Sequence, residues 1–302
     1  MADEVLPAGI TDLITSEAMA NEFLMLLADR DGSILQHPAL FHATAPNMTS
    51  TVVRVPHIGL DGYDLLVATT PGSEVANTPL SDGHTDVTVA MRAKRYNVDD
   101  FARFLVNGKL DPIALARDGA ISVAQTLISL IANVTDNFTG YVGSSGVDCS
   151  WNDILDGKTL LRINKVTGDI LSIVAPRQWG DLEIDALSLG VLPAQSMGGV
   201  ITVGLGGSYT GRWMGVDFCV HSSVPTANAG ADRAGGMFGR GALAWADAQM
   251  VPENDPNIVE MGRARFERVR KGDFLASSHI TSYACGVAKA IDAAGVSIIT
   301  DA

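Results

Sequence analysis

The sequence predicts a mixed α+β fold. Three observations lead to this class: a long helical pattern in the middle of the chain, β-branched segments on both sides of a glycine- and proline-rich stretch, and an alternation of short helices and strands towards the C-terminus. The chain has 302 residues, of which 47% are hydrophobic and 18% charged, so it has ample material for a buried core. This composition is the reverse of that of a disordered chain.

The first region of the chain is predicted to be a loose arm followed by one helix. Residues 1–11 are small and acidic and include proline and glycine. From Ser16, which can cap a helix, four apolar residues fall on one face until Gly32 ends the pattern: Met19, Phe23, Leu26 and Leu27. Residues 37–48 contain two prolines and are expected to be irregular.

Residues 50–92 are the most unusual segment. They open with a strand-like run at 51–55 and close with another at 87–91, and the sequence between is rich in Gly, Pro, Asp and Thr. If both sides ran extended as a hairpin, each limb of ~20 residues would reach ~60 Å, whereas a compact chain of this length has a radius of gyration of only ~19 Å. Such an arm would need a neighbouring molecule to lie on, because an isolated hairpin is barely stable in water. A loop folded back within one domain is the other interpretation, and the spacing alone leaves both open.

A helical patch at 98–106 and a long helix over 112–138 are expected next. Pro112 suits the first turn of a helix. Apolar residues then recur at spacings of four and three, which gives one amphipathic face: Ala120, Ala124, Leu127, Ile131, Val134 and Phe138. At 1.5 Å per residue the helix would be ~40 Å long, which predicts a structural spine whose packing rests on those six residues.

The rest of the chain alternates between helices and strands. Glycines at 140–146 break the chain first. The patterns after them predict helices at 151–162 and 179–189, strands at 169–175, 199–203, 216–221 and 237–245, a Gly/Ala-rich linker at 226–236, a charged extended section at 257–282, and a final strand at 296–299. No internal repeat is evident.

Charge is unevenly distributed along the chain. The net charge is −13, and the three successive thirds carry −9, −3 and −1. This balance argues against a protein that grips nucleic acid electrostatically, because phosphate neutralisation needs many Lys and Arg residues.

Two segments stand out against this background. Residues 50–91 carry −4, from one basic and five acidic residues: Arg54, Asp61, Asp64, Glu74, Asp82 and Asp86. Residues 262–273 carry +3 and hold five basic residues: Arg263, Arg265, Arg268, Arg270 and Lys271. The two could pair between subunits and fix their register. The basic segment could equally be a solvated face, or could make weak, sequence-independent contact with DNA.

Cysteine usage and hydropathy predict a soluble protein made inside a cell. Cys149, Cys219 and Cys285 are widely spaced and odd in number, so they are expected to be small core residues in a reducing compartment. No basic segment precedes an apolar stretch at the N-terminus, so no signal peptide is expected. The longest apolar runs, such as 127–134, fall short of the ~18 residues needed to span a bilayer.

The sequence contains few matches to known catalytic or cofactor-binding motifs, and those it contains lack the structural context that the motif requires. Residues 239–244 fit GxGxx(G/A), but no strand precedes them, as a dinucleotide-binding site requires. The six histidines are scattered and show no metal-ligand spacing. We therefore predict no enzyme, no cofactor and no metal site. The alternative is an α+β small-molecule enzyme or binding module that uses the glycine-rich turns near 204–211 or 235–241.

The order of these parts resembles the major capsid protein of tailed bacteriophages, the Hong Kong 97-like fold, over nearly the whole chain. The residues at 174–179 look like the "xxPxxW" strand-to-helix entry common in these proteins. Residues 215–220, 224–225 and 238–243 are similar to the "G..v..s..vp…f..gAl" run of many such coats. The ending at 295–300 looks like their last strand. Each pattern is soft, and their order and spacing together support the resemblance.

The resemblance implies a division into five segments: an N-terminal arm at 1–49, an E-loop at 50–92, a P-domain with the spine helix at 93–146, an A-domain at 147–255, and a return to the P-domain at 256–302. It also implies self-assembly through hexamers and pentamers into an icosahedral shell around double-stranded DNA. Further implied partners are portal, scaffolding and decoration proteins, and the implied location is the virion, with assembly in the host cytoplasm. Residues 50–92 contain no lysine, so the lysine–asparagine cross-link known in this family is not expected here.

Overall fold

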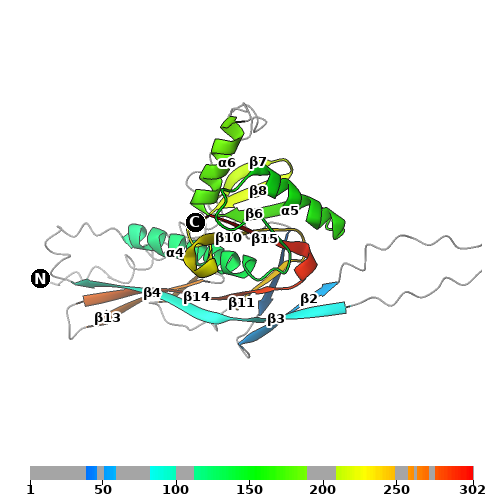
Figure 1. Cartoon of the computed structure of the whole chain (residues 1–302). Coiled ribbons are helices and arrows are strands. Elements are labelled where there is room, and N and C mark those ends of the chain that lie inside the picture. Colours follow the sequence, from blue (N-terminus) through cyan, green and yellow to red (C-terminus); the bar gives the residue numbers. More distant parts are fainter. Residues whose placement is uncertain are drawn as a thin grey trace, which may run out of the picture.

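The computed structural model describes residues 39–45, 51–58, 82–99, 112–188, 209–248, 258–261, 264–271 and 276–301. These residues form a long lower sheet, a helix that lies along it, and an upper lobe of sheet and helices (Figure 1). The helix α4 contacts β14 of the lower sheet and also β10 and β15 of the lobe. It is therefore the layer that joins the two parts, and the predicted α+β class is confirmed.

We call the lower sheet the platform. It has six strands in the order β1-β11-β14-β13-β12, with β4 paired to β14. Only β1 is parallel to its neighbour. Cys285 of β14 pairs with Ala90 on one side and Asp247 on the other, so β4 and β11 lie along opposite edges of β14. The strand bounds are β1 (Leu40–Ala45), β4 (Ala90–Asp99), β11 (Leu243–Ala248), β12 (Ile258–Met261), β13 (Ala264–Lys271) and β14 (Ala276–Lys289).

The platform changes two expectations and confirms another. Residues 37–48 were expected to be irregular, but Leu40–Ala45 is strand β1, paired with β11. The helical patch predicted at 98–106 is wrong at its start, because β4 continues as strand to Asp99, where pairing with Ala276 outweighs the local helical pattern. The described residues of the section predicted to be extended at 257–282 are strands: β12, β13 and the first half of β14. The boundary predicted between the E-loop and the P-domain, at residues 92 and 93, falls within β4.

A separate hairpin lies on the platform. Strands β2 (Val52–Ile58) and β3 (Asp82–Thr88) pair antiparallel from Val52 opposite Thr88 to Ile58 opposite Asp82. The predicted strand-like runs are therefore confirmed as paired strands, while the choice between a projecting arm and a folded-back loop depends on the residues between them. The residues between the limbs, 59–81, lie outside the described part of the chain.

The spine helix α4 (Pro112–Thr135) begins at the predicted proline and ends three residues before the predicted Phe138. A turn then leads to the short strand β5 (Tyr141–Val142) within the predicted glycine break. The helix predicted after Ser16 and the strand predicted at 199–203 lie outside the described residues.

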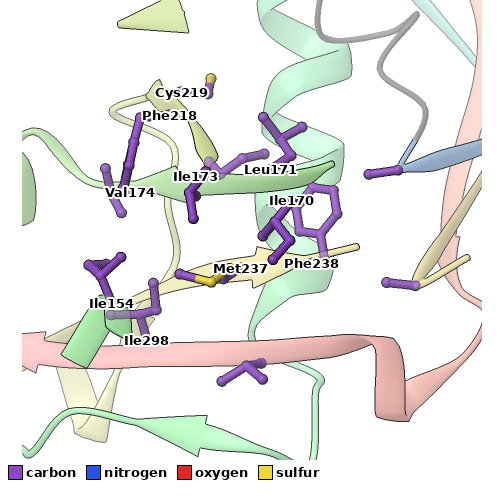
Figure 2. Packing of buried hydrophobic residues seen from close by; sticks show 14 of the residues in the cluster. Ile154, Ile170, Leu171, Ile173, Val174, Phe218, Cys219, Met237, Phe238 and Ile298 are labelled. Carbon is purple, nitrogen blue, oxygen red and sulfur yellow. The ribbon is translucent and has the colours of Figure 1, made fainter. Parts of the chain in front are cut away.

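The lobe is a seven-stranded sheet in the order β5-β15-β10-β6-β8-β7, with β9 paired to β10. Ser150 caps α5 in a reciprocal capping box with Asp153, and Pro176 begins α6 directly after β6. The remaining bounds are α5 (Trp151–Ile163), β6 (Ile170–Val174), α6 (Pro176–Ser188), β7 (Tyr209–Trp213), β8 (Val216–Val220), β9 (Thr226–Ala227), η3 (Asn228–Gly230), β10 (Asp232–Phe238), η5 (Asp292–Ala294) and β15 (Gly295–Asp301). The core lies where α5, β6, β8, β10 and β15 meet, with Phe218, Met237 and Phe238 fully buried (Figure 2).

The linker predicted at 226–236 is wrong, because Asp232–Phe238 is a central strand of the lobe, paired with both β6 and β15. Its glycines are sites of close approach. A Cβ atom on Gly235 would lie 2.7 Å from Oε1 of Gln178, and one on Gly236 would lie 2.4 Å from Cβ of Thr135. Successive residues of a strand face opposite sides, so these two glycines let α6 and α4 approach β10 from its two faces. The strand predicted at 237–245 is accordingly two strands, β10 and β11, joined by a turn.

Candidate assembly surfaces

The base of the hairpin is attached to the platform by small apolar side chains. Alternate residues of the hairpin face the platform and are buried: Val53, Val55, Val87 and Val89. They pack on alanines of β11 and β14: Ala244, Ala246, Ala248 and Ala284. The contact is close enough that a Cβ atom on Gly286 would lie 2.1 Å from the carbonyl oxygen of Thr88. The alternation of valines in the sequence is thus the signal that positions the hairpin.

The outward face of the hairpin carries an ion pair. Arg54 and Asp86 are direct cross-strand partners, with Nε of the arginine 3.0 Å from Oδ1 of the aspartate. A hydrogen bond from Arg54 lowers the pKa of Asp86, and the same pairing raises the pKa of Arg54. The side chains are 66% and 46% exposed, so the pair contributes little to stability and serves mainly to fix the register of the strands.

The structure places the other predicted hairpin acids only in part. Asp82 is the first residue of β3, opposite Ile58. Asp61, Asp64 and Glu74 lie outside the described residues.

Of the predicted spine residues, Leu127, Ile131 and Phe138 are buried in the described core, and Val134 packs against it. The side chains of Ala120 and Ala124 lie outside the described part. The sequence pattern missed buried residues on the same helix: Val123, Ile128, Ala132 and Thr135. The helix packs against two sheets rather than one, so its apolar face is wider than a single stripe predicts.

Polar contacts fix α4 to the platform near its first half. Nζ of Lys94 on β4 lies 2.8 Å from Oδ2 of Asp118 and donates to Oγ of Ser122. The hydroxyl of Tyr96 also bonds to Asp118. At Gly119 the helix crosses β14, where a Cβ atom would lie 2.5 Å from Oγ1 of Thr281. These contacts set the position of the helix along β4 and β14.

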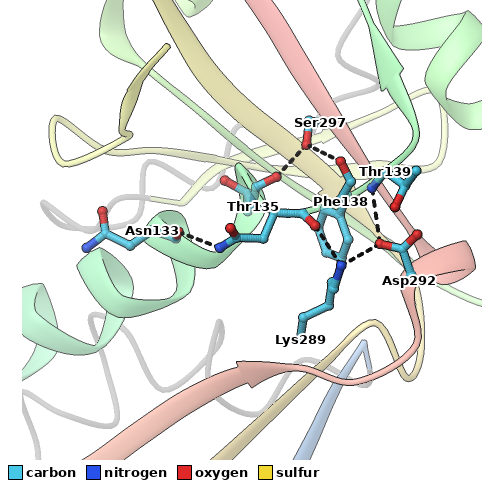
Figure 3. Close-up of polar contacts among 8 residues, drawn as sticks. Asn133, Thr135, Phe138, Thr139, Lys289, Asp292 and Ser297 are labelled. Atoms are coloured by element: carbon cyan, nitrogen blue, oxygen red, sulfur yellow. Dashed lines mark hydrogen bonds and ion pairs between the residues drawn. The ribbon is translucent and has the colours of Figure 1, made fainter. Parts of the chain in front are cut away.

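A second set of contacts holds the C-terminal end of the spine (Figure 3). Ser297 donates to the carbonyl oxygen of Thr135 over 2.6 Å, and Lys289 donates to that of Asn137 over 2.7 Å. These carbonyls belong to the end of the helix and the turn after it, where orphan acceptors need partners. Burial acts to raise the pKa of Asp292, but hydrogen bonds from Lys289 and Thr139 outweigh burial, and the pKa is lowered. The end of α4 is therefore joined to β14, η5 and β15 together.

The basic segment lies in the platform. Arg265, Arg268, Arg270 and Lys271 belong to β13, which pairs with the first half of β14, and Arg263 lies outside the described residues. On the other edge of β14 the structure brings in β4, with three further basic residues that sequence reasoning did not single out: Arg92, Lys94 and Arg95. Oγ of Ser278 accepts from Arg95 over 2.7 Å. The two basic strands are distant in the sequence, and only the sheet pairing could show that they flank one strand.

Two buried polar residues of the lobe were also missed. Oε1 of Gln178 accepts from the backbone N–H of Ala175 over 2.9 Å, and its Nε2 donates to Oγ1 of Thr300 and to carbonyl oxygens of β10 and β15. Asp232 accepts from the backbone N–H of Gly146 over 3.0 Å, and hydrogen bonds from Ser145 and Asn228 and from that amide lower its pKa. Both residues hold lobe segments together. A glutamine just inside a helix start gives no sequence signal of this role.

The cysteines of the chain are buried and unreactive. Burial is the main cause that raises the pKa of the Cys149 thiol to about 12 and that of Cys285 to about 11, so neither is a ready nucleophile. Cys219 is buried as well, and the prediction of core cysteines is confirmed. No group of three His, Cys, Asp or Glu residues is placed to hold a metal among the residues described. The same residues contain no helix long and apolar enough to cross a membrane.

The turns proposed for the alternative function offer no binding site where they are described. Gly235 and Gly236 lie inside β10, where Gln178 and Thr135 fill the space beside them. The end of the other turn, from Tyr209, is strand β7, and residues 204–208 lie outside the described part. The motif at 239–244 connects β10 to β11, and a Cβ atom on Gly239 would lie 2.2 Å from Cγ1 of Val166.

Comparison with known proteins identifies the fold. No family model and no curated protein matches the sequence. Among solved structures, the chain is similar to the capsid of Ralstonia phage GP4 at a TM-score of 0.58 and 12% identity, covering 86% of each chain. It is similar to a structure from Mycobacterium phage Che8 at a TM-score of 0.55 and 17% identity, covering 83% of this chain and 85% of that chain. It is also similar to the SrpI encapsulin complex from Synechococcus elongatus PCC 7942 at a TM-score of 0.54 and 15% identity, covering 85% and 84%. The chain has the Hong Kong 97-like fold shared by phage capsids and encapsulins, as the sequence resemblance predicted.

Proposed function

We propose that this protein is the major capsid protein of a tailed phage and that it assembles through hexamers and pentamers into an icosahedral shell around double-stranded DNA. The observation that carries the proposal is the hairpin β2–β3. Its base is buried on the platform through Val53, Val55, Val87 and Val89, and the strand pairing continues beyond these valines to Ile58 opposite Asp82. Two strands alone are barely stable in water, so the outer part of such a hairpin calls for a surface on another molecule.

A second copy of the chain supplies a suitable surface. Residues 50–91 carry a net charge of −4, and the two strands that flank β14 carry most of the basic residues of the platform. Arg54 and Asp86 satisfy each other within the hairpin. The contact that we propose therefore joins Asp61, Asp64, Glu74 and Asp82 of one copy to the basic strand of the next. Such pairing sets register and orientation more than affinity.

The same charge distribution suits a container for DNA. A wall with a net charge of −13 per subunit encloses DNA without binding it tightly, because too few phosphates are neutralised. The basic residues of β4 and β13 could still make weak contact with the enclosed DNA. Portal, scaffolding and decoration proteins are the further partners in this proposal. The place of action is the virion, after assembly in the host cytoplasm.

The test is electron microscopy and light scattering of the purified protein, followed by nuclease treatment of particles isolated from their native source. The proposal expects closed shells and DNA that the shell protects from nuclease. A protein that stays a small monomer at every concentration overturns the proposal.

The similarity to the SrpI encapsulin complex supports a second candidate, a shell that holds a protein cargo. The same isolated particles separate the two functions, since they would then contain a defined protein and no protected DNA. The remaining alternative is a small-molecule enzyme or binding module. It predicts that the protein is a stable monomer that binds a small molecule tightly.

A further inference from the structure

A half-open cavity, which we call the spine cavity, lies between α4 and the platform. It has a volume of about 120 Å³, whereas about 10–15 Å³ are enough for one water molecule. Successive residues of a strand face opposite sides, so Thr281 of β14 faces α4 while Gly286 faces the hairpin. The cavity is therefore on the face of β14 away from the hairpin. Its polar lining comes from β4, α4 and β14: Arg92, Lys94, Ser122, Thr126, Thr281 and Tyr283.

Small residues of α4 create this cavity. Gly119 lets the helix approach β14 so closely that a Cβ atom there would lie 2.5 Å from Oγ1 of Thr281. One turn further along the helix, Ser122, Val123 and Thr126 line the cavity, and these short side chains leave its space open. The close approach at Gly119 thus fixes one wall of the cavity.

Arg92 supplies a positive charge that no carboxylate pairs with in the described part of the chain. It is the cross-strand partner of Tyr283, so its side chain lies on the same face as the cavity. Burial raises the pKa of the Cys285 thiol, while the charge of Arg92 and its hydrogen bond to the thiol act against that rise. A thiol is a weak partner, so most donors of the guanidinium remain available. Asp247, which accepts from Tyr283 over 3.3 Å, is buried and does not line the cavity.

Lys94 already has partners, and its charge is neutralised within the chain. Its ammonium donates to Asp118 and to Oγ of Ser122, each over 2.8 Å. An ammonium has three donors, so one remains for a ligand. Because Lys94 and Asp118 cancel each other, the excess charge beside the cavity is that of Arg92.

Thr281 gives a second, independent observation. It is only 5% exposed, and its hydroxyl makes no hydrogen bond with any residue that the structure describes. Buried hydroxyls are nearly always hydrogen-bonded, so this one calls for a partner inside the cavity that it lines. Ser122 and Thr126 differ, because their hydroxyls donate to carbonyl oxygens of α4 over 2.8 and 2.7 Å.

We propose that the spine cavity binds a phosphate group, which joins α4 to β4 and β14. Arg92 donates charge-assisted hydrogen bonds to the phosphate oxygens, and Thr281 and the third N–H of Lys94 complete the donors. Donors on several sides suit a tetrahedral oxyanion. All these residues belong to one chain, so the inference does not depend on the proposed function. The phosphate is either a free ion or part of a nucleic acid.

The test is calorimetric titration of the purified full-length protein with inorganic phosphate, with sodium chloride at equal ionic strength as the reference. We expect saturable binding, and an unfolding midpoint that rises with phosphate until the site is full. Saturation is the deciding feature, because phosphate is also excluded from protein surfaces and in this way stabilises folded proteins without a site.

Three variants locate the binding. Arg92→Gln should weaken phosphate binding about tenfold, since it removes charge-assisted hydrogen bonds. Arg95→Gln is the matched control, because Arg95 belongs to the same strand but to its other face, where it donates to Ser278. It should bind phosphate as wild type does. Thr281→Val should also weaken binding, yet be at least as stable as wild type in chloride, because it removes a buried hydroxyl that has no partner.

A duplex oligonucleotide at the same concentration of phosphate groups separates the two sources. Binding that is tighter than that of inorganic phosphate and is lost in Arg92→Gln assigns the site to nucleic acid. Inorganic phosphate that the duplex does not displace assigns it to the free ion. The proposal is overturned if neither compound binds saturably, if Arg92→Gln and Arg95→Gln weaken binding equally, or if Thr281→Val is less stable than wild type in chloride.

Discussion

At the scale of single residues, the position of the hairpin depends on Gly286. Because the atom facing this glycine is a backbone oxygen of Thr88, a side chain here cannot be accommodated by a rotamer change. We expect Gly286→Ala to move the hairpin and to cost about 1–3 kcal/mol, the usual range for an overpacked site. Chemical denaturation measures the loss, and proteolysis of the hairpin measures its detachment.

Gly180 in α6 is the matched control, since no atom lies within 4 Å of the position of its missing Cβ. Alanine is a better helix former than glycine, so Gly180→Ala should instead stabilise the protein by about 0.5–1 kcal/mol. A destabilisation of equal size in both variants would contradict the close contact at Gly286.

Gln178 gives a second prediction, which depends on pH. In Gln178→Glu a carboxylate would face three oxygen acceptors, those of Arg233, Ile298 and Thr300, so burial and repulsion would raise its folded-state pKa. A raised pKa means that stability is lost as the pH rises above the unfolded-state value of ~4.3. We expect a cost of about 3 kcal/mol at pH 7 that becomes smaller towards pH 4.

Denaturation of wild type and variant across this pH range measures the difference. Gln125→Glu, at an exposed position of α4, is the control and should change stability little at any pH. A penalty for Gln178→Glu that is the same at pH 4 and pH 7 contradicts the hydrogen-bond assignment.

At the scale of residues, the sequence predicted side chains that belong to a periodic pattern and missed single polar residues that belong to none. The period of three and four along α4 predicted Leu127 and Ile131 as core residues, and the β-branched runs at 51–55 and 87–91 predicted strands on both sides of the hairpin segment. Gln178 and Asp232 belong to no pattern, because each meets partners from elements far away in the chain. Glycines 235 and 236 were misinterpreted as a linker, since close approach of a helix and chain flexibility both select glycine.

At the scale of elements, the hairpin separates into a base and an outer part with different roles. The base is held by the valine–alanine contact and needs no neighbour. We expect that replacing residues 59–81 by a two-residue Asn-Gly turn leaves this base and the rest of the chain folded, because the new turn suits a tight hairpin. Shell assembly should be lost.

Circular dichroism and the unfolding midpoint report folding, and electron microscopy reports assembly. A variant in which the acidic residues of 59–81 are changed to Asn or Gln keeps the length of the segment and tests its charge separately. Intact shells from the shortened variant contradict the role given to this segment.

At the scale of the whole molecule, the charge distribution predicts how assembly responds to salt. If the acidic hairpin of one copy meets the basic strands of the next, added salt weakens the contact, because the Debye length falls from ~10 Å at 0.1 M to ~3 Å at 1 M. Arg263→Glu with Arg265→Glu should therefore impair assembly strongly at low salt and less, relative to wild type, at high salt.

Arg240→Glu, in the exposed turn between β10 and β11, reverses the same kind of charge away from the platform and is the control. Light scattering against salt concentration measures each variant. A double variant that responds to salt as wild type does would show that the basic strand is only a solvated face.

The order of the elements along the chain could be predicted because it follows the order known for this fold. The pairing of strands that are distant in the sequence could not be predicted. The sequence resemblance placed the hairpin strands, the spine helix and the final strand in the correct succession. It could not show that β4 and β13 lie on the two edges of β14, since strands of similar composition can pair in several orders.

The length of β14 has a mechanical consequence. Its 14 residues extend over ~48 Å and join the basic end of the platform to the alanine surface under the hairpin. A force that pulls the hairpin along the strand direction acts in parallel on the hydrogen bonds that join β14 to β4, β11 and β13. Many of these bonds must then break at the same time rather than one after another. In the proposed shell, pressure from inside would thus put each subunit under tension along the direction in which this sheet is strongest.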